Sequence, residues 1–169
     1  FFGSAMTIQI PAYTLDILNG NETVTTFLLA AFAVGVGIGS LLCERMSGHR
    51  IELGLVPFGA IGLSVFALDL YFAQPHAQSV PVSSIAEFLA RPGGMRVWID
   101  LALIGAFGGF YSVPLYALIQ KRSNKRHLSR IIAANNIINS LLMVSAAVMS
   151  MVLLDIGLSI PELFAVVAG

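Results

Sequence analysis

The stretch TVTTFLLAAFAVGVGIGSLLC, residues 23–43, contains no charged residue and is as long as a helix that crosses a membrane. Such a helix needs roughly 20 apolar residues to cross about 30 Å of hydrocarbon. Three more stretches resemble it in length and composition: 53–73, 101–119 and 131–154. Only helices and closed barrels satisfy backbone polar groups in lipid, and continuous apolar sequence favours helices. The sequence therefore predicts an all-α, polytopic membrane helix bundle.

Composition and charge agree with a membrane protein and predict its orientation. The chain is 57% hydrophobic and only 11% charged, against about 25% charged residues in soluble domains. Seven of its nine Lys and Arg residues fall in the short stretches 45–50 and 121–130. By the positive-inside rule, we expect loops 44–52 and 120–130 in the cytoplasm and loop 74–96 in the periplasm. Such short basic loops favour anionic lipid headgroups over nucleic acid as partners.

The two ends of the sequence resemble helices that have been cut. Residues 1–18 are apolar without a preceding basic region, which argues against a signal peptide. Pro11 predicts a kink there, and Asn19-Gly20 predicts the end of the helix. Ser159-Ile-Pro-Glu162 is typical of a capping box that starts a last helix. We expect one domain, 1–169, with helices at about 1–18, 23–43, 53–73, 97–120, 129–154 and 160–169, the first and last truncated, and a short interfacial helix within 83–90.

Small residues recur at helical spacing in two of the predicted spanning helices. They are Ala31, Gly35 and Gly39 in one helix and Gly105 and Gly109 in another. Such stripes let helix backbones approach closely where lipid supplies no hydrophobic drive. We therefore favour helix packing over substrate contact as the role of these glycines.

Sequence motifs of enzymes are missing from the chain. It contains no G-x-S-x-G, no Walker loop and no G-x-G-x-x-G, so nothing points to hydrolase chemistry or to ATP. The lone Cys43 excludes an internal disulfide and a cysteine-based zinc site. We expect this segment to have no catalytic residues, no cofactor and no metal.

Polar residues at membrane depth are the remaining candidates for function. Asn135 and Asn139, four residues apart, share one helix face, and Asn136 lies beside them. Their amides can hydrogen-bond a neighbouring helix or line a polar cavity, and both roles stay open. Asp69 and Asp100 lie near the outer ends of their helices, where an interfacial position is favoured over a buried one. An intramembrane carboxylate binds protons or cations, so Asp69 is a candidate ion or proton site.

The loop after the second helix, GSLLCERMSGHR at 39–50, resembles the signature loop of the major facilitator superfamily, G-x-x-x-D-R-x-G-R-R. Glu44 and Arg45 stand at its acidic and basic positions, and Arg50 lies in its basic pair. The match departs from the pattern, because Glu replaces Asp and Gly48 comes one residue late. The resemblance implies the C-terminal six-helix half of a twelve-helix transporter, with Glu44, Arg45 and Arg50 in a gating loop.

Three longer stretches, 39–62, 107–120 and 130–144, resemble the bacterial lysophospholipid transporter family. They are most similar to the variant fused to acyltransferase and acyl-acyl carrier protein synthetase domains. The resemblance implies a multi-pass protein of the bacterial inner membrane that flips lysophosphatidylethanolamine-class lipids for re-acylation. Its partners would be the bilayer, the lysophospholipid, an N-terminal six-helix half and the fused enzymes.

Pseudo-symmetry of such transporters places the substrate between the two halves near the midplane. We therefore predict substrate contacts at Tyr13, Tyr111, Asn135 and Asn139. Two alternatives stay open: a general solute or drug exporter of the same superfamily, and a membrane anchor for the fused enzymes. The charged groups of the other half would distinguish an exporter from a lysolipid carrier. Transport assays would distinguish both of these from a membrane anchor, which moves nothing.

Overall fold

The computed structural model describes residues 2–47, 52, 54–73, 82–124 and 126–168. Within these residues every regular element is a helix. They are α1 (Phe2–Ala12), the π-helix η1 (Tyr13–Ile17), α2 (Glu22–Met46), α3 (Leu55–Phe72), α4 (Ile85–Ala90), α5 (Gly94–Arg122), α6 (Leu128–Asp155) and α7 (Ile160–Ala168). Four of them, α2, α3, α5 and α6, are long and apolar enough to cross a membrane. The chain is therefore an all-helical membrane protein in the part described, as predicted.

The helix ends follow local sequence signals. The expected kink at Pro11 is a change from α- to π-geometry directly after Ala12. Asn19 then takes a left-handed conformation, φ 49°, which ends the helix. Asn21 caps α2 by accepting a hydrogen bond from the Val24 amide at 3.0 Å. With α1 and η1 taken together as the predicted first helix, each helix begins and ends within three residues of its predicted bounds.

The predicted loops are shorter than expected because helices extend into them. Glu44 and Arg45 belong to the last turn of α2, and Lys121 and Arg122 end α5. The loop expected at 74–96 contains α4 and the first turn of α5. At the start of α7, the Ser159 amide and hydroxyl both donate to the Glu162 carboxylate, as the glutamate of the predicted capping box should accept.

Glycines set the contact between α2 and α5, the most extensive helix pair in the described chain. A Cβ atom at Gly35 or Gly39 would collide with the carbonyl oxygens of Ala102 and Ala106 on α5. The predicted glycines of α5 face α2 in the same way: Gly105 and Gly109. The two backbones therefore touch directly, and the prediction that these small residues serve helix packing is confirmed.

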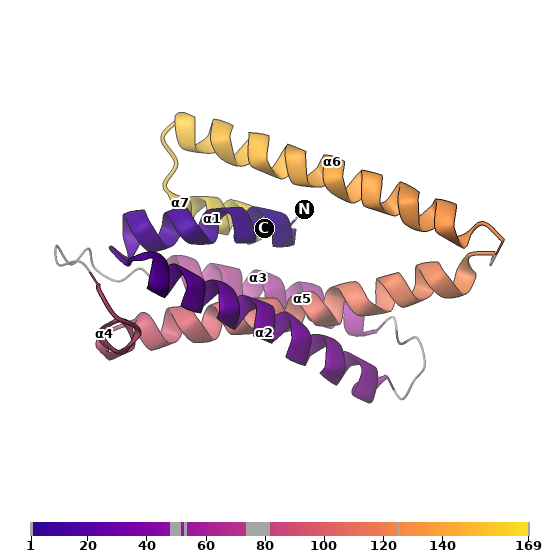
Figure 1. The fold of residues 1–169 in the computed structure, drawn as a ribbon, viewed down its shortest axis with the longest axis horizontal. Helices are drawn as coiled ribbons and strands as arrows, with labels where there is room; N and C mark the ends of the chain where they lie inside the picture. Colours follow the sequence, from indigo (N-terminus) through magenta and orange to yellow (C-terminus); the bar gives the residue numbers. More distant parts are fainter. Residues whose placement is uncertain (1, 48–51, 53, 74–81, 125, 169) are drawn as a thin grey trace.

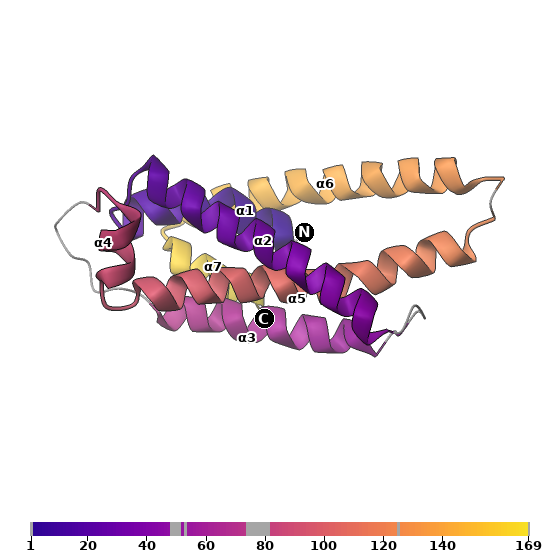
Figure 2. The ribbon, with the colours of Figure 1, turned by 60° about the horizontal axis from the view of Figure 1, so that its bottom comes forward.

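The helices form two groups, which meet where α7 packs against α3. Helix α5 packs against α2 and α3, whereas α6 packs mainly against α1 and α7. Figures 1 and 2 show α5 and α6 running side by side but apart, joined at the end of the molecule opposite α4. The basic ends of α2 and α5 both lie at that end. We call it the basic end, and the opposite one the α4 end.

Candidate functional site

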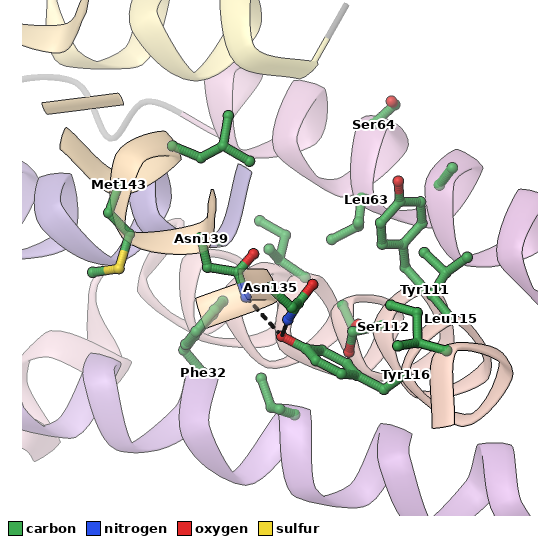
Figure 3. Close-up of a pocket in the computed structure, with 17 residues that line it drawn as sticks. Phe32, Leu63, Ser64, Tyr111, Ser112, Leu115, Tyr116, Asn135, Asn139 and Met143 are labelled. Atoms are coloured by element: carbon green, nitrogen blue, oxygen red, sulfur yellow. Dashed lines mark hydrogen bonds between the residues drawn. The ribbon is translucent and has the colours of Figure 1, made fainter. Parts of the chain in front are cut away.

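A cavity of about 860 Å³ lies between the two groups of helices. Residues from α1, α2, α3, α5 and α6 line it, and most of them are apolar. Its polar side chains come from three helices: Ser64, Tyr111, Ser112, Tyr116, Asn135 and Asn139. Figure 3 shows Tyr116, Asn135 and Asn139 meeting at one place, with Ser64 apart from them. None of the described residues that line it carries a charge. The cavity is thus apolar with a neutral polar cluster at one place.

A three-residue hydrogen-bond network forms the centre of this cluster. The Asn139 amide nitrogen donates to the Tyr116 hydroxyl oxygen at 2.9 Å, and the Asn135 amide nitrogen lies 3.5 Å from the same oxygen. Because Tyr116 accepts these contacts, its own O–H stays available to donate, and the amide oxygens stay available to accept. The network can therefore offer both donors and acceptors to a ligand.

The helices turn these side chains toward the cavity, while most of their neighbours on α6 are exposed. Asn135 and Asn139 lie one turn apart on α6, whereas the neighbouring Asn136 points away and is exposed. Ser112 and Tyr116 have the same four-residue spacing on α5, so their side chains meet the α6 face. Pro114 lies between them inside α5 and removes one backbone donor, as any helical proline does.

The structure brings together three of the four predicted substrate contacts. Tyr111, Asn135 and Asn139 all line the cavity. Tyr13 does not: it is fully buried, and its ring packs edge-on against Phe164 of α7 at a centroid distance of 5.4 Å. The reason is the π-helix at Tyr13, which faces α7 and the end of the bundle near α4.

The predicted gating residues lie apart from the cavity. Glu44 and Arg45 are exposed in the last turn of α2, and Arg50 lies outside the described residues. Their role in gating stays a prediction.

The two transmembrane aspartates differ in environment. Asp69 on α3 forms a bidentate ion pair with Arg96 on α5, in which Arg96 Nε lies 3.0 Å from Asp69 Oδ2 and Nη2 contacts Oδ1. Asp100, one turn further along α5, is only 2% exposed. The expectation that Asp100 is interfacial was therefore wrong, because α5 turns it into the bundle and not toward the interface.

Sequence reasoning gave Tyr116 no place among the site residues, although it is the centre of the polar network. One signal in the sequence could have identified Tyr116. It follows Ser112 by four residues, with Pro114 between them, and Asn135 and Asn139 have the same spacing on the next helix.

Among the described residues no group of three or more His, Cys, Asp or Glu side chains could hold a metal ion. No protein-family model, curated protein or solved structure matches the chain.

Proposed function

We propose that the chain is the C-terminal six-helix half of a major facilitator transporter that flips lysophospholipids of the lysophosphatidylethanolamine class across the bacterial inner membrane. The observation that carries the proposal is the cavity, which joins a neutral polar network to an extensive apolar wall. Its volume lies within the roughly 300–1,000 Å³ of typical ligand sites. The resemblance of residues 39–62, 107–120 and 130–144 to lysophospholipid transporters supports the same assignment.

The chemistry of a lysophospholipid suits this lining. Its zwitterionic head is costly to move through hydrocarbon, but its single acyl chain is not. The Tyr116 hydroxyl can donate to a phosphate oxygen, and the amide oxygens of Asn135 and Asn139 can accept from an ammonium group. Apolar side chains of the same cavity, among them Phe32, Leu142 and Met143, would contact the chain.

The two halves of the transporter would share the work of binding. Charged groups that balance the headgroup would come from the N-terminal half, because the lining described here is neutral. The fused acyltransferase and synthetase domains would use the lysolipid that arrives at the inner leaflet. The basic end would then face the cytoplasm, where positive residues are retained.

The proposed orientation predicts which residues an impermeant thiol reagent reaches in intact cells. Cys43 is buried, so it should give a low background and can be replaced. A cysteine at Ser83, exposed at the α4 end, should be labelled, whereas a cysteine at Ser129, exposed at the basic end, should be labelled only after lysis. Labelling of the Ser129 position alone in intact cells would reverse the orientation.

Transport itself tests the function. The full-length protein, reconstituted in vesicles, should move fluorescent lysophosphatidylethanolamine between leaflets much faster than the diacyl lipid, because the proposed substrate has a single acyl chain. Empty vesicles provide the baseline. Equal movement of unrelated drugs would favour the general exporter. If the lysolipid moves no faster than in empty vesicles, the result would favour the alternative that the chain is an anchor for the fused enzymes.

A further inference from the structure

Three glycines lie close together in the middle of α5, and helix packing explains only two of them. A Cβ atom at Gly105 or Gly109 would collide with backbone atoms of α2. A Cβ atom at Gly108 would meet only the Leu63 side chain, at 3.9 Å, which is ordinary van der Waals contact. Glycine destabilises the interior of a helix relative to alanine. Packing among the described residues therefore gives no reason for glycine at position 108.

Gly108 lines the cavity between a polar and an apolar part of α5. Cavity residues recur on this helix at four-residue spacing: Ile104, Gly108, Ser112 and Tyr116. Tyr116 belongs to the hydrogen-bond network with the two asparagines, whereas Ile104 is apolar and fully buried. At 1.5 Å per residue, Gly108 lies about 12 Å along the helix axis from Tyr116 and about 6 Å from Ile104. The row therefore changes from polar to apolar at Gly108.

Apolar side chains of α2 and α3 border the space beside Gly108. Leu63 of α3 lies within contact distance of a Cβ atom placed there. Phe32 and Val36 of α2, whose backbone atoms lie against Gly105 one turn away, line the same cavity. The space at position 108 is thus continuous with an apolar part of the cavity wall.

The backbone of Gly108 offers a ligand no free hydrogen-bond acceptor. Its carbonyl oxygen accepts from the Ser112 hydroxyl at 2.8 Å. In an α-helix the same oxygen also accepts from the Ser112 amide, so both of its lone pairs are engaged. What Gly108 offers is therefore room for an apolar group.

We infer that Gly108 is a specificity-determining residue of the cavity, which leaves room for the acyl chain of the substrate where that chain passes from the polar network toward Ile104. The inference rests on the proposed function, in which the Tyr116 network binds the headgroup. A long acyl chain then extends past Gly108, whereas a very short one ends before it. A side chain at position 108 would occupy the space that the long chain needs.

Transport of lysophosphatidylethanolamines with two chain lengths tests this inference on the full-length protein in vesicles. Gly108→Leu fills the space with a branched side chain, so the stearoyl lipid should move at about one tenth of the wild-type rate. A tenfold loss corresponds to about 1.4 kcal/mol. The butanoyl lipid, whose chain ends before position 108, should move at a rate near that of the wild type.

Two further variants separate chain specificity from an effect on folding. Gly37→Leu adds the same side chain on α2, at a glycine that does not line the cavity and whose Cβ would meet nothing within 4 Å. It should move both lipids at the wild-type rates. If Gly108→Leu does not fold, Gly108→Ala replaces it, because its Cβ fits against Leu63. It should slow the stearoyl lipid alone, by less than leucine does.

The outcomes distinguish this inference from the proposed function. Slower movement of the stearoyl lipid alone in a folded Gly108 variant supports the inference. Equal slowing of both lipids, or no slowing of either, would overturn it and leave the proposed function standing. If the wild type moves neither lipid, the proposed function fails and the inference falls with it.

Discussion

Replacement of Gly39 by alanine should destabilise the bundle more than alanine at any other glycine of α2. The new Cβ would lie 2.6 Å from the Ala106 Cα and collide with its carbonyl oxygen, and backbone atoms of α5 cannot move aside as a flexible side chain can. Overpacking typically costs about 1–3 kcal/mol, and we expect the upper end of this range. The midpoint of thermal unfolding in detergent should fall by roughly 6–12 °C.

Gly37→Ala is the matched control for this prediction. Gly37 lies on the same helix two residues away, and a Cβ there meets nothing within 4 Å. Alanine is the better helix former by about 1 kcal/mol, so the control should unfold at an equal or slightly higher temperature. Equal midpoints for the two variants would show that α2 and α5 are not in backbone contact.

The spanning helices could be predicted from sequence because the signal is local. An uninterrupted apolar run of membrane length forms a helix in lipid, because a helix satisfies its own backbone hydrogen bonds. The predicted bounds of α2, α3, α5 and α6 lie within three residues of the observed ones. Caps are local too, as Asn21 and the Ser159 capping box show. The glycine stripe was equally readable, since only close helix packing needs small residues at that spacing.

The positions of Tyr13, Tyr116 and Asp100 could not be predicted in the same way. A membrane helix is apolar all round, so its pattern does not tell which face meets a neighbour and which meets lipid. Tyr13 faces α7 because η1 is a π-helix. Its wider turn changes the side of the helix on which the residues after Pro11 lie. The burial of Asp100 depends on the packing of α5 against α3, an element distant in sequence.

Asn139→Leu in the full-length protein should reduce lysolipid flipping per molecule by about tenfold or more. Asn139 donates to Tyr116 and lines the cavity, so leucine removes a donor and an acceptor that a headgroup would use. A hydrogen bond to a charged group is worth roughly 1.5–3 kcal/mol, and the transport rate should fall accordingly. The loss of stability should be small, about 0.6 kcal/mol for a typical intramembrane hydrogen bond.

Asn136→Leu is the control on the same helix. Asn136 is exposed and does not line the cavity, so leucine there should leave flipping unchanged. Tyr116→Phe removes the hydroxyl shared by both asparagines and should reduce flipping at least as much as Asn139→Leu. These variants separate a role of the polar network in substrate binding from a general effect of apolar substitution on α6.

The most direct test of the central claim is to measure thermal stability and flipping of lysophosphatidylethanolamine per molecule on one preparation of Asn139→Leu. If the network binds the headgroup, the unfolding midpoint should stay near that of the wild type while flipping falls by about tenfold. If the network only holds α6 against α5, the midpoint should fall and the surviving protein should flip lysolipid at the normal rate. That second result would contradict the account.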